Sequence, residues 1–371
     1  MATGARARID ELESLRGIAA LLVVFFHIPK WHPALDLPLV DNAYLMVELF
    51  FVLSGFVIYG AYADRIRDAG ALARFQFLRF ARLYPVHLLF LLVFLGIEGA
   101  KALATARLGM AGGQDAPFAV NDARAFAENL FLVQALRPDP ALTFNYPSWS
   151  ISVEFWTYLV FGLLTLGLGA RKDAGFALIA LLSLALLAAG ATGGMEPLLK
   201  CLGGFFLGAL VARAMGRPRR LPLPPPAPMA ALMLAFLMLK PAGRFDILIF
   251  PLAAALVAAL VAVPAGPMAR ALRHRPLVRL GEVSYSLYMA HASVLWGANQ
   301  AVRLWSDRPD APDATGRMIP QLSLPGCLLA VALSLAVALA LAVLVHAWVE
   351  RPFRDWSRKV RPARGAVRPA G

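Results

Sequence analysis

The sequence has few charged residues for its length. Of its 371 residues only 16% are charged and 59% are hydrophobic, whereas about a quarter of the residues in a soluble domain are charged. So few polar residues cannot cover a water-facing surface, which excludes a disordered chain and a soluble multidomain enzyme. The mean hydropathy of +0.64 agrees with this reading. The composition therefore predicts an integral membrane protein.

Cysteine is also scarce, and no internal repeat is visible. The two cysteines, Cys201 and Cys327, both lie in apolar runs and form no CxxC or other metal-like spacing. This pattern excludes a disulfide framework and a zinc site, so we expect no metal and assign both cysteines to packing. The lack of repeats counts against a transporter, because many transporters are built from them.

Positive charge is in excess, with a net charge of +13. The basic residues cluster between apolar stretches, at positions 65–82, 213–220, 270–279 and 351–364. Cytoplasmic loops of membrane proteins show this pattern. The excess of positive charge therefore indicates which loops are cytoplasmic, and we expect no nucleic-acid partner.

Apolar runs of about 17–25 residues predict membrane-spanning helices. The candidates are residues 14–29, 44–62, 80–97, 149–168, 174–191, 197–213, 227–240, 245–264, 283–303 and 323–347. A shorter apolar run at 124–136 is ambiguous. The basic clusters all fall on the cytoplasmic side of the membrane only if this run does not cross the membrane. The sequence therefore predicts an all-α integral membrane bundle of about ten transmembrane helices, with a re-entrant or interfacial element between the third and fourth.

This topology divides the chain into two parts and places both termini in the cytoplasm. Residues 1–350 form the transmembrane domain, and residues 351–371 form a basic cytoplasmic tail. The first apolar segment lacks a small-residue cleavage site, so we expect it to be retained. The proline-rich stretch 218–228 is interpreted as a stiff cytoplasmic linker.

Insertion of an ionisable side chain into the middle of a membrane costs roughly 2.5–3.5 kcal/mol, so each such residue suggests a polar site. Arg16 and His27 are eleven residues apart in the first span, which is close to three helical turns, so both project from one face about 16 Å apart. A membrane anchor and an interfacial histidine are the alternative interpretation of this pair.

Two glutamates fall at similar depth. Glu48 opens the second span, and Glu154 lies inside the outer end of the fourth span among hydroxyls and tryptophans. An interfacial role for Glu48 is the alternative. Both glutamates and His27 belong to the non-cytoplasmic half in this topology, so we expect them to converge on one polar site. Lys200 is a weaker candidate in the same half.

Further basic residues mark the cytoplasmic side of the third span. Arg79 and Arg82 have i, i+3 spacing and therefore share a helix face that can bind phosphates. Arginines that anchor a helix at the membrane surface have the same spacing. His291 lies about two turns into the ninth span, where a hydrogen-bonded core histidine is the competing interpretation. His87 and His346 are interpreted as structural.

The pattern resembles the membrane-bound acyltransferase family 3, in its stand-alone form, from Arg8 to about Arg354. An arginine and a histidine separated by ten residues in the first helix, here Arg16 and His27, form one family signature. The other blocks are FFVLSGF at 50–56, SWSISVEFW at 148–156, SYSLYMAH at 284–291 and ERPF at 350–353. Two positions depart from the family pattern: Leu78 replaces an extra basic residue, and Lys200 stands where an arginine is expected.

The resemblance implies transfer of an acyl group, usually acetyl from acetyl-CoA, to a hydroxyl of an extracytoplasmic glycan or lipid-linked saccharide. We therefore expect Arg16, Arg79 and Arg82 to hold the donor's phosphates through their guanidinium groups. We expect His27 to act as general base or transient acyl carrier, oriented by Glu154 and by Glu48 if it takes part. Residues expected to contact substrate or support the site are Trp149, Ser152, Tyr288 and His291.

The expected location is a bacterial inner membrane, and acyl-CoA, a glycan acceptor and the lipid bilayer are the expected partners. Two rival functions remain. A polytopic solute transporter or exporter also needs buried charges, but would show flux without donor turnover. A non-catalytic scaffold for an envelope-polysaccharide complex would tolerate the loss of His27.

Overall fold

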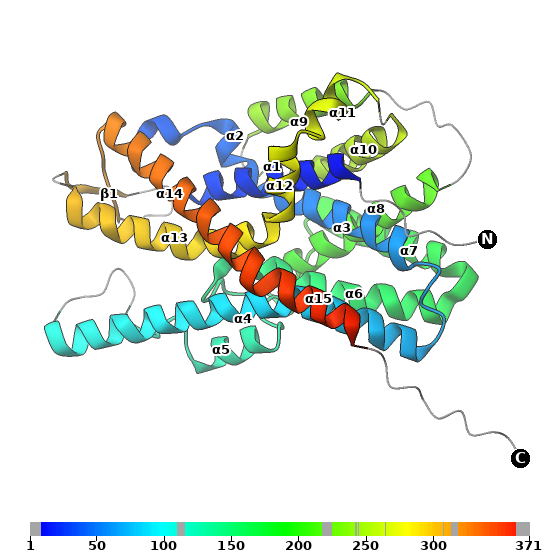
Figure 1. Cartoon of the computed structure of the whole chain (residues 1–371), viewed down its shortest axis with the longest axis horizontal. Coiled ribbons are helices and arrows are strands. Elements are labelled where there is room, and N and C mark those ends of the chain that lie inside the picture. Colours follow the sequence, from blue (N-terminus) through cyan, green and yellow to red (C-terminus); the bar gives the residue numbers. More distant parts are fainter. Residues whose placement is uncertain are drawn as a thin grey trace, which may run out of the picture.

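The computed structural model describes residues 9–109, 116–216, 225–241, 243, 245–263, 265–306, 308–312 and 318–360, and it is a bundle of helices (Figure 1). The first eight helices are α1 (Asp10–His27), α2 (Pro38–Asp41), α3 (Met46–Tyr62), α4 (Ala69–Leu108), α5 (Ala123–Leu130), α6 (Trp149–Leu168), α7 (Lys172–Ala188) and α8 (Glu196–Met215). The others are α9 (Pro226–Leu239), α10 (Ile249–Ala262), α11 (Pro267–Leu272), α12 (Arg275–Glu282), α13 (Ser284–Trp305), α14 (Leu324–Val345) and α15 (Arg351–Lys359).

Short elements join these helices. The 3-10 turns are Pro33–Leu35, Ala43–Leu45, Tyr146–Ser148, Gly169–Arg171 and Asp246–Leu248. A π-helical turn, His346–Glu350, connects α14 to α15. The strands β1 (Asp310–Pro312) and β2 (Met318–Pro320) form an antiparallel pair in which Ala311 faces Ile319.

Helix starts follow from local chemistry. The Asp68 carboxylate accepts a hydrogen bond from the Ala71 amide at the start of α4, and Asp122 does the same for Ala125 at the start of α5. Ser323 caps α14 through the Gly326 amide. These contacts satisfy amide groups that have no partner within the helix. α4 continues through Pro85, where one backbone donor is lost.

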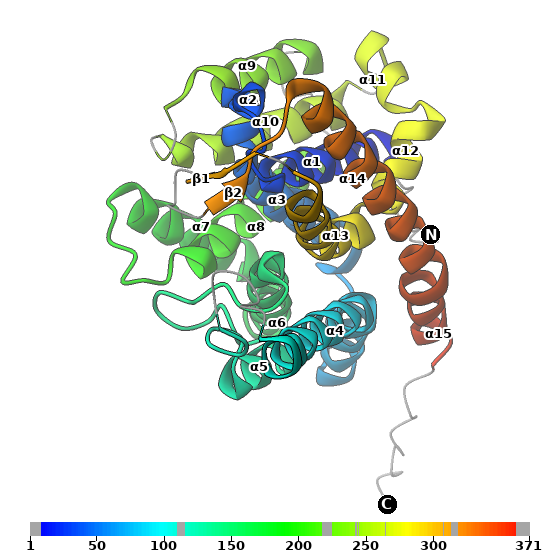
Figure 2. The ribbon, with the colours of Figure 1, turned by 90° about the vertical axis from the view of Figure 1, so that its left-hand side faces the viewer.

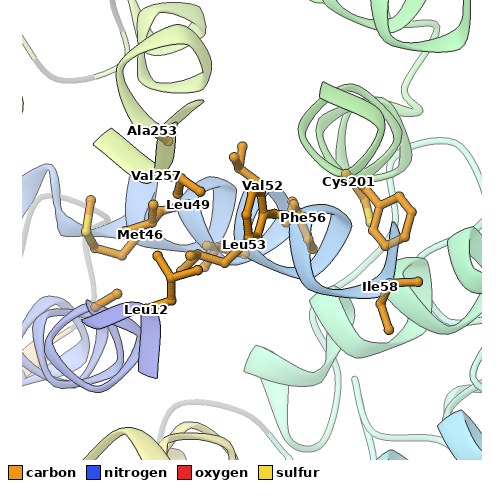
Figure 3. Packing of buried hydrophobic residues seen from close by; sticks show 14 of the residues in the cluster. Leu12, Met46, Leu49, Val52, Leu53, Phe56, Ile58, Cys201, Ala253 and Val257 are labelled. Atoms are coloured by element: carbon orange, nitrogen blue, oxygen red, sulfur yellow. The ribbon is translucent and has the colours of Figure 1, made fainter. Parts of the chain in front are cut away.

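Helix α3 forms the centre of the hydrophobic core. Its buried side chains, among them Leu49, Val52 and Phe56, belong to one cluster with residues of α1, α8 and α10. Figure 3 shows these side chains in contact with all three neighbouring helices. In Figure 2, α1 and α3 lie in the middle of the bundle, with α9 and α10 on one side and α4, α5 and α6 on the other.

Helices α3 and α8 approach closely because glycines face the partner backbone. A Cβ atom added to Gly55 would lie 1.8 Å from the Phe205 carbonyl oxygen, and one added to Gly208 would lie 2.0 Å from the Val52 carbonyl oxygen. Only glycine fits at these two positions, so this contact fixes how α3 sits against α8.

Several helices can cross a membrane by length and composition. Among the described residues five segments qualify: Ala43–Tyr62, Ala69–Arg107, Tyr146–Ala188, Glu196–Met215 and Leu324–Lys359. Two shorter apolar helices are Pro226–Leu239 and Asp246–Ala262. The helical class is thus confirmed, and five of the described segments are candidates for membrane spans, fewer than the predicted ten.

Each of the ten predicted apolar segments coincides with a helix. The ambiguous run at 124–136 contains α5, whose eight residues extend only about 12 Å and are too short to cross. Residues 351–359 of the predicted tail are helical, whereas residues 361–371 and most of the predicted proline-rich linker, 217–224, lie outside the described residues.

Candidate active site

A cavity of about 80 Å³ lies where α1, α3, α4, α6 and α13 meet. Its charged lining comes from three helices: Arg16 from α1, Arg79 and Arg82 from α4, and Glu154 from α6. The other polar lining residues are Ser54, Ser150, Tyr158, Ser284, Tyr285 and Tyr288. The fold thus brings the three predicted phosphate-binding arginines together.

The arginines face the cavity with much of their hydrogen-bonding capacity free. Arg79 donates from Nη2 to the Tyr62 hydroxyl at 3.1 Å, while its buried Nε has no partner. Its guanidinium group also packs on the Tyr62 ring, 5.2 Å from the centroid. Arg16 pairs with Glu13 at 3.3 Å. Arg82 forms no hydrogen bond or ion pair with another described residue. The cavity is therefore suited to an anion.

Glu154 supplies the carboxylate of this cavity. Its Oε1 accepts hydrogen bonds from the Ser54 and Tyr158 hydroxyl groups, each at 2.5 Å. Tyr158 follows Glu154 by four residues, so both lie on one face of α6. Sequence reasoning missed Ser54 and Tyr158 as site residues, although the i, i+4 spacing of Tyr158 from Glu154 could have identified the tyrosine.

His27 ends α1 and meets His291 of α13. The His27 Nδ1 atom lies 2.9 Å from the Val23 carbonyl oxygen and 3.2 Å from His291 Nε2. The ring of Tyr146 lies beside the pair, 5.0 Å from the His27 ring between centroids. The structure thus places a second imidazole, rather than a carboxylate, against His27.

Tyr288 lies between the cavity and the histidine pair. It lines the cavity, and its ring centroid is 5.7 Å from that of His291. Its hydroxyl group donates to the Pro147 carbonyl and contacts Ser150 Oγ, both at 2.9 Å. This side chain connects the arginine cavity to the histidine pair.

The other predicted site residues lie in separate contacts. Glu48 is buried and pairs with Lys200 at 3.2 Å, and Lys200 also pairs with Glu196 at 2.8 Å. Trp149 packs edge-on against Phe51. Ser152 donates to the Leu132 carbonyl at 2.7 Å and so anchors the chain that precedes α6. The predicted group of His27, Glu48 and Glu154 is therefore divided among three different sets of partners.

Glu350 is a buried carboxylate that sequence reasoning did not assign to the site, although it opens the ERPF block. It accepts a hydrogen bond from Ser286 at 2.8 Å and contacts His346 Nδ1 at 3.1 Å. It also interacts electrostatically with Arg82. His87 contacts the Asn129 carbonyl at 2.8 Å, away from the cavity. In the described part of the chain, no group of three or more His, Cys, Asp or Glu side chains could hold a metal ion.

Comparison with known proteins identifies a family. The sequence model described as the acyltransferase domain of acyltransferase family 3 matches residues 9–343. The acyltransferase MdmB of Streptomyces mycarofaciens is 35% identical over 165 residues, which are 42% of this chain and 39% of the relative. Protein 2 in the picA locus of Rhizobium radiobacter is 41% identical over 83 residues, 21% of this chain and 39% of the relative.

The alignments thus span about two-fifths of the length of each curated relative. No solved structure matches the chain. The family match extends over all the described helices from α1 to α13 and most of α14. It confirms the resemblance that the sequence blocks predict, and it supports the predicted class of enzyme. The chain belongs to the acyltransferase 3 family.

Proposed function

We propose that this protein is a membrane-embedded acyltransferase that moves an acyl group, first of all acetyl, from cytoplasmic acyl-CoA to a hydroxyl group of an extracytoplasmic glycan or lipid-linked saccharide. The observation that carries the proposal is that Arg16, Arg79 and Arg82 share one cavity, while the helix that supplies Arg16 ends at His27.

The cavity is the site for the donor's phosphates. Guanidinium groups form paired, charge-assisted hydrogen bonds with phosphate oxygens, and they remain charged in buried surroundings. Glu154 offsets part of the positive charge and holds Ser54 and Tyr158 in place. Its role is therefore to shape the donor cavity rather than to orient His27.

His27 is the general base. Eleven residues of one helix separate it from Arg16, which corresponds to about 16 Å along the axis. An extended pantetheine arm spans this distance, so a donor held at its phosphates presents its thioester near His27. The acceptor hydroxyl loses its proton to the imidazole as its oxygen attacks the thioester carbonyl, and the coenzyme A thiolate leaves.

The accompanying topology has ten crossings of a bacterial inner membrane, with both termini in the cytoplasm. In support, each predicted apolar segment coincides with a helix. Arg65 and Arg67 lie in the loop before α4, and Arg74 lies in the second turn of α4, as expected for the cytoplasmic end of a membrane-spanning helix. The acyl group therefore crosses the bundle while the donor's phosphates stay on the cytoplasmic side.

The test is acetyl-CoA turnover by purified protein in lipid nanodiscs, with extracted envelope glycans as a mixed acceptor pool. We expect acetyl on a glycan with the wild type and with His274→Ala, an exposed control, and none with His27→Ala. The proposal fails if folded wild type neither binds nor turns over acetyl-CoA, or if His27→Ala acetylates the glycan as well as the wild type.

A further inference from the structure

The two ring nitrogens of His27 have different surroundings. Nδ1 lies 2.9 Å from the Val23 carbonyl oxygen, which can only accept a hydrogen bond. A proton on Nδ1 makes this contact a hydrogen bond, whereas a lone pair there would repel the carbonyl. Nε2 makes no hydrogen bond to any residue that the structure describes, and the side chain is partly exposed. The contact with Val23 therefore favours a neutral His27 with its proton on Nδ1.

His291 meets the same Nδ1 atom with its own Nε2, at 3.2 Å. If His27 Nδ1 carries a proton, His291 Nε2 must be an acceptor, so His291 carries its proton on Nδ1. That Nδ1 is buried and has no hydrogen-bond partner among the described residues, while the backbone of Leu287 and Tyr288, one helical turn earlier, interacts with the His291 side chain. A proton suits the carbonyl groups of these two residues better than a lone pair does, so both histidines favour the same arrangement.

We infer that His291 is a positioning residue that holds His27 in the tautomer whose free lone pair is on Nε2, and that it accepts a hydrogen bond from the His27 imidazolium formed during transfer. The inference rests on the proposed function and names the nitrogen that takes the acceptor's proton. A partner imidazole thus does for His27 what a carboxylate does for the histidine of a serine hydrolase.

The step balances without a further reactant. The acceptor hydroxyl gives its proton to His27 Nε2 as its oxygen forms a bond to the thioester carbon. The carbon–sulfur bond then breaks, and the sulfur leaves with the electron pair. His27, now protonated on both nitrogens, donates through Nδ1 to Val23 and His291. It then returns the Nε2 proton to the thiolate, which regenerates the neutral tautomer and releases coenzyme A.

A neutral partner suits this position in the fold. His291 is fully buried in α13, and a carboxylate there would have to be kept charged in apolar surroundings even when His27 is neutral. An imidazole fixes the tautomer without adding a charge. It stabilises the imidazolium only during transfer, when the positive charge exists.

Three substitutions of His291 separate this role from simple packing. The amide of His291→Gln reaches the position of Nε2 and can accept from His27, whereas the shorter amide of His291→Asn cannot, and His291→Ala has no acceptor. A hydrogen bond to a charged group contributes about 1.5–3 kcal/mol, which corresponds to roughly 10–100-fold in rate. We expect kcat to fall by that factor in the Asn and Ala variants and by less than about tenfold in the Gln variant.

The Michaelis constant for acetyl-CoA should stay unchanged in all three variants, because the arginine cavity is intact. An unchanged constant also shows that each variant is folded. His274→Gln, at an exposed site, is the matched control and should behave as the wild type. Equal losses of kcat in the Gln and Asn variants, or wild-type kcat in His291→Ala, would overturn the inference.

The tautomer has a readout that does not depend on turnover. In protein labelled with ¹⁵N-histidine in nanodiscs, the His27 signals are assigned by their absence in His27→Ala. We expect a protonated Nδ1 and an unprotonated Nε2, and a proton found on Nε2 would contradict the inference. If the wild type shows no acyl transfer, the proposed function fails, and the ¹⁵N spectrum still decides the tautomer.

Discussion

Arg82 lines the cavity with a guanidinium group that forms no hydrogen bond or ion pair with another described residue. Glu350, Glu13 and Glu154 act on it through longer-range electrostatics. A partly buried cation without a close partner is costly, and an anionic ligand would relieve that cost. At the scale of single residues, this is the strongest sign of a phosphate-bearing donor.

Replacement of Arg82 should therefore weaken donor binding. We expect Arg82→Ala to raise the KM for acetyl-CoA by roughly 10–100-fold, because a hydrogen bond to a charged group contributes about 1.5–3 kcal/mol. Arg82→Lys should give an intermediate value, since an ammonium group cannot bind a phosphate in paired fashion. Initial rates against acetyl-CoA concentration measure this effect.

The matched control is Arg351→Ala, whose side chain is 68% exposed on α15. It should leave the KM at the wild-type value. If Arg82→Ala also keeps the wild-type KM for acetyl-CoA, Arg82 does not bind the donor.

The residues of the cavity were predictable from sequence, but their partners were not. Arg16, Arg79, Arg82 and Glu154 are charged residues in or beside apolar runs, so their cost at membrane depth identifies them. Which residues they meet depends on how each helix is rotated. α14 is apolar around almost its whole circumference, and α3 carries only a few polar side chains, among them Glu48 and Ser54, so neither helix has a polar face that shows which side points inward.

At the scale of elements, the contact between α3 and α8 controls the shape of the cavity wall. The cavity is lined by four residues of α3: Val47, Phe50, Phe51 and Ser54. The same helix contacts the backbone of α8 at Gly55, which has no side chain to keep the helices apart. A shift of α3 away from α8 would therefore move cavity residues directly.

Alanine at Gly55 or Gly208 should lower the thermal stability of the protein. The added Cβ would meet backbone oxygens at 1.8 Å and 2.0 Å respectively, so the helices must move apart. Overpacking of this kind costs about 1–3 kcal/mol or more. Thermal unfolding in nanodiscs, followed by intrinsic fluorescence, measures the change.

Gly96→Ala is the control, because Gly96 lies in α4 and has no atom within 4 Å of the added Cβ. We expect it to be neutral or to stabilise by about 0.5–1 kcal/mol, because alanine is the better helix former. Equal unfolding temperatures for Gly96→Ala and Gly208→Ala would show that the α3 and α8 contact is not tight.

The sequence predicted where helices lie better than how far they extend. The apolar run at 80–97 marks only the middle of α4, which the structure extends to Ala69–Leu108. Both ends are polar and carry no membrane signal, although the Asp68 cap could have indicated the start. The π-helical turn at His346–Glu350 was also not predictable, because one inserted residue leaves the apolar pattern of α14 unchanged.

At the scale of the whole molecule, the proposed topology places the two ends of α1 on opposite sides of the membrane. Ala34 lies in the exposed loop after α1, and Arg67 lies in the exposed loop between α3 and α4. Single cysteines at these positions report the sidedness of each loop. The native Cys201 and Cys327 are both fully buried, so their background labelling should be low.

A membrane-impermeant maleimide should label Ala34→Cys in spheroplasts. Arg67→Cys should be labelled only after the membrane is permeabilised. The reverse pattern, or labelling of both before permeabilisation, would refute the topology and with it the cytoplasmic position of the donor cavity.

The lengths of the helices differ greatly between the two sides of the molecule shown in Figure 2. α4 has 40 residues and is about 60 Å long, whereas α9 has 14 residues and is about 21 Å long, and the helix Asp246–Ala262 that contains α10 is about 27 Å long. A bilayer has a hydrocarbon core of about 30 Å. Helices α9 and α10 are therefore too short for an undeformed bilayer, while α4 is long enough to pass beyond both surfaces.

Because of this difference in helix length, we expect the stability of the protein to depend on bilayer thickness. Lipids beside α9 and α10 must compress, at a cost of fractions of a kcal/mol per Å of mismatch, so bilayers of short-chain lipids should favour the folded protein. We expect higher unfolding temperatures and faster turnover in such bilayers than in long-chain ones, and equal values would argue against compression. Turnover that rises as the lipid chains shorten would then show that helix length adapts this fold to a thin bilayer.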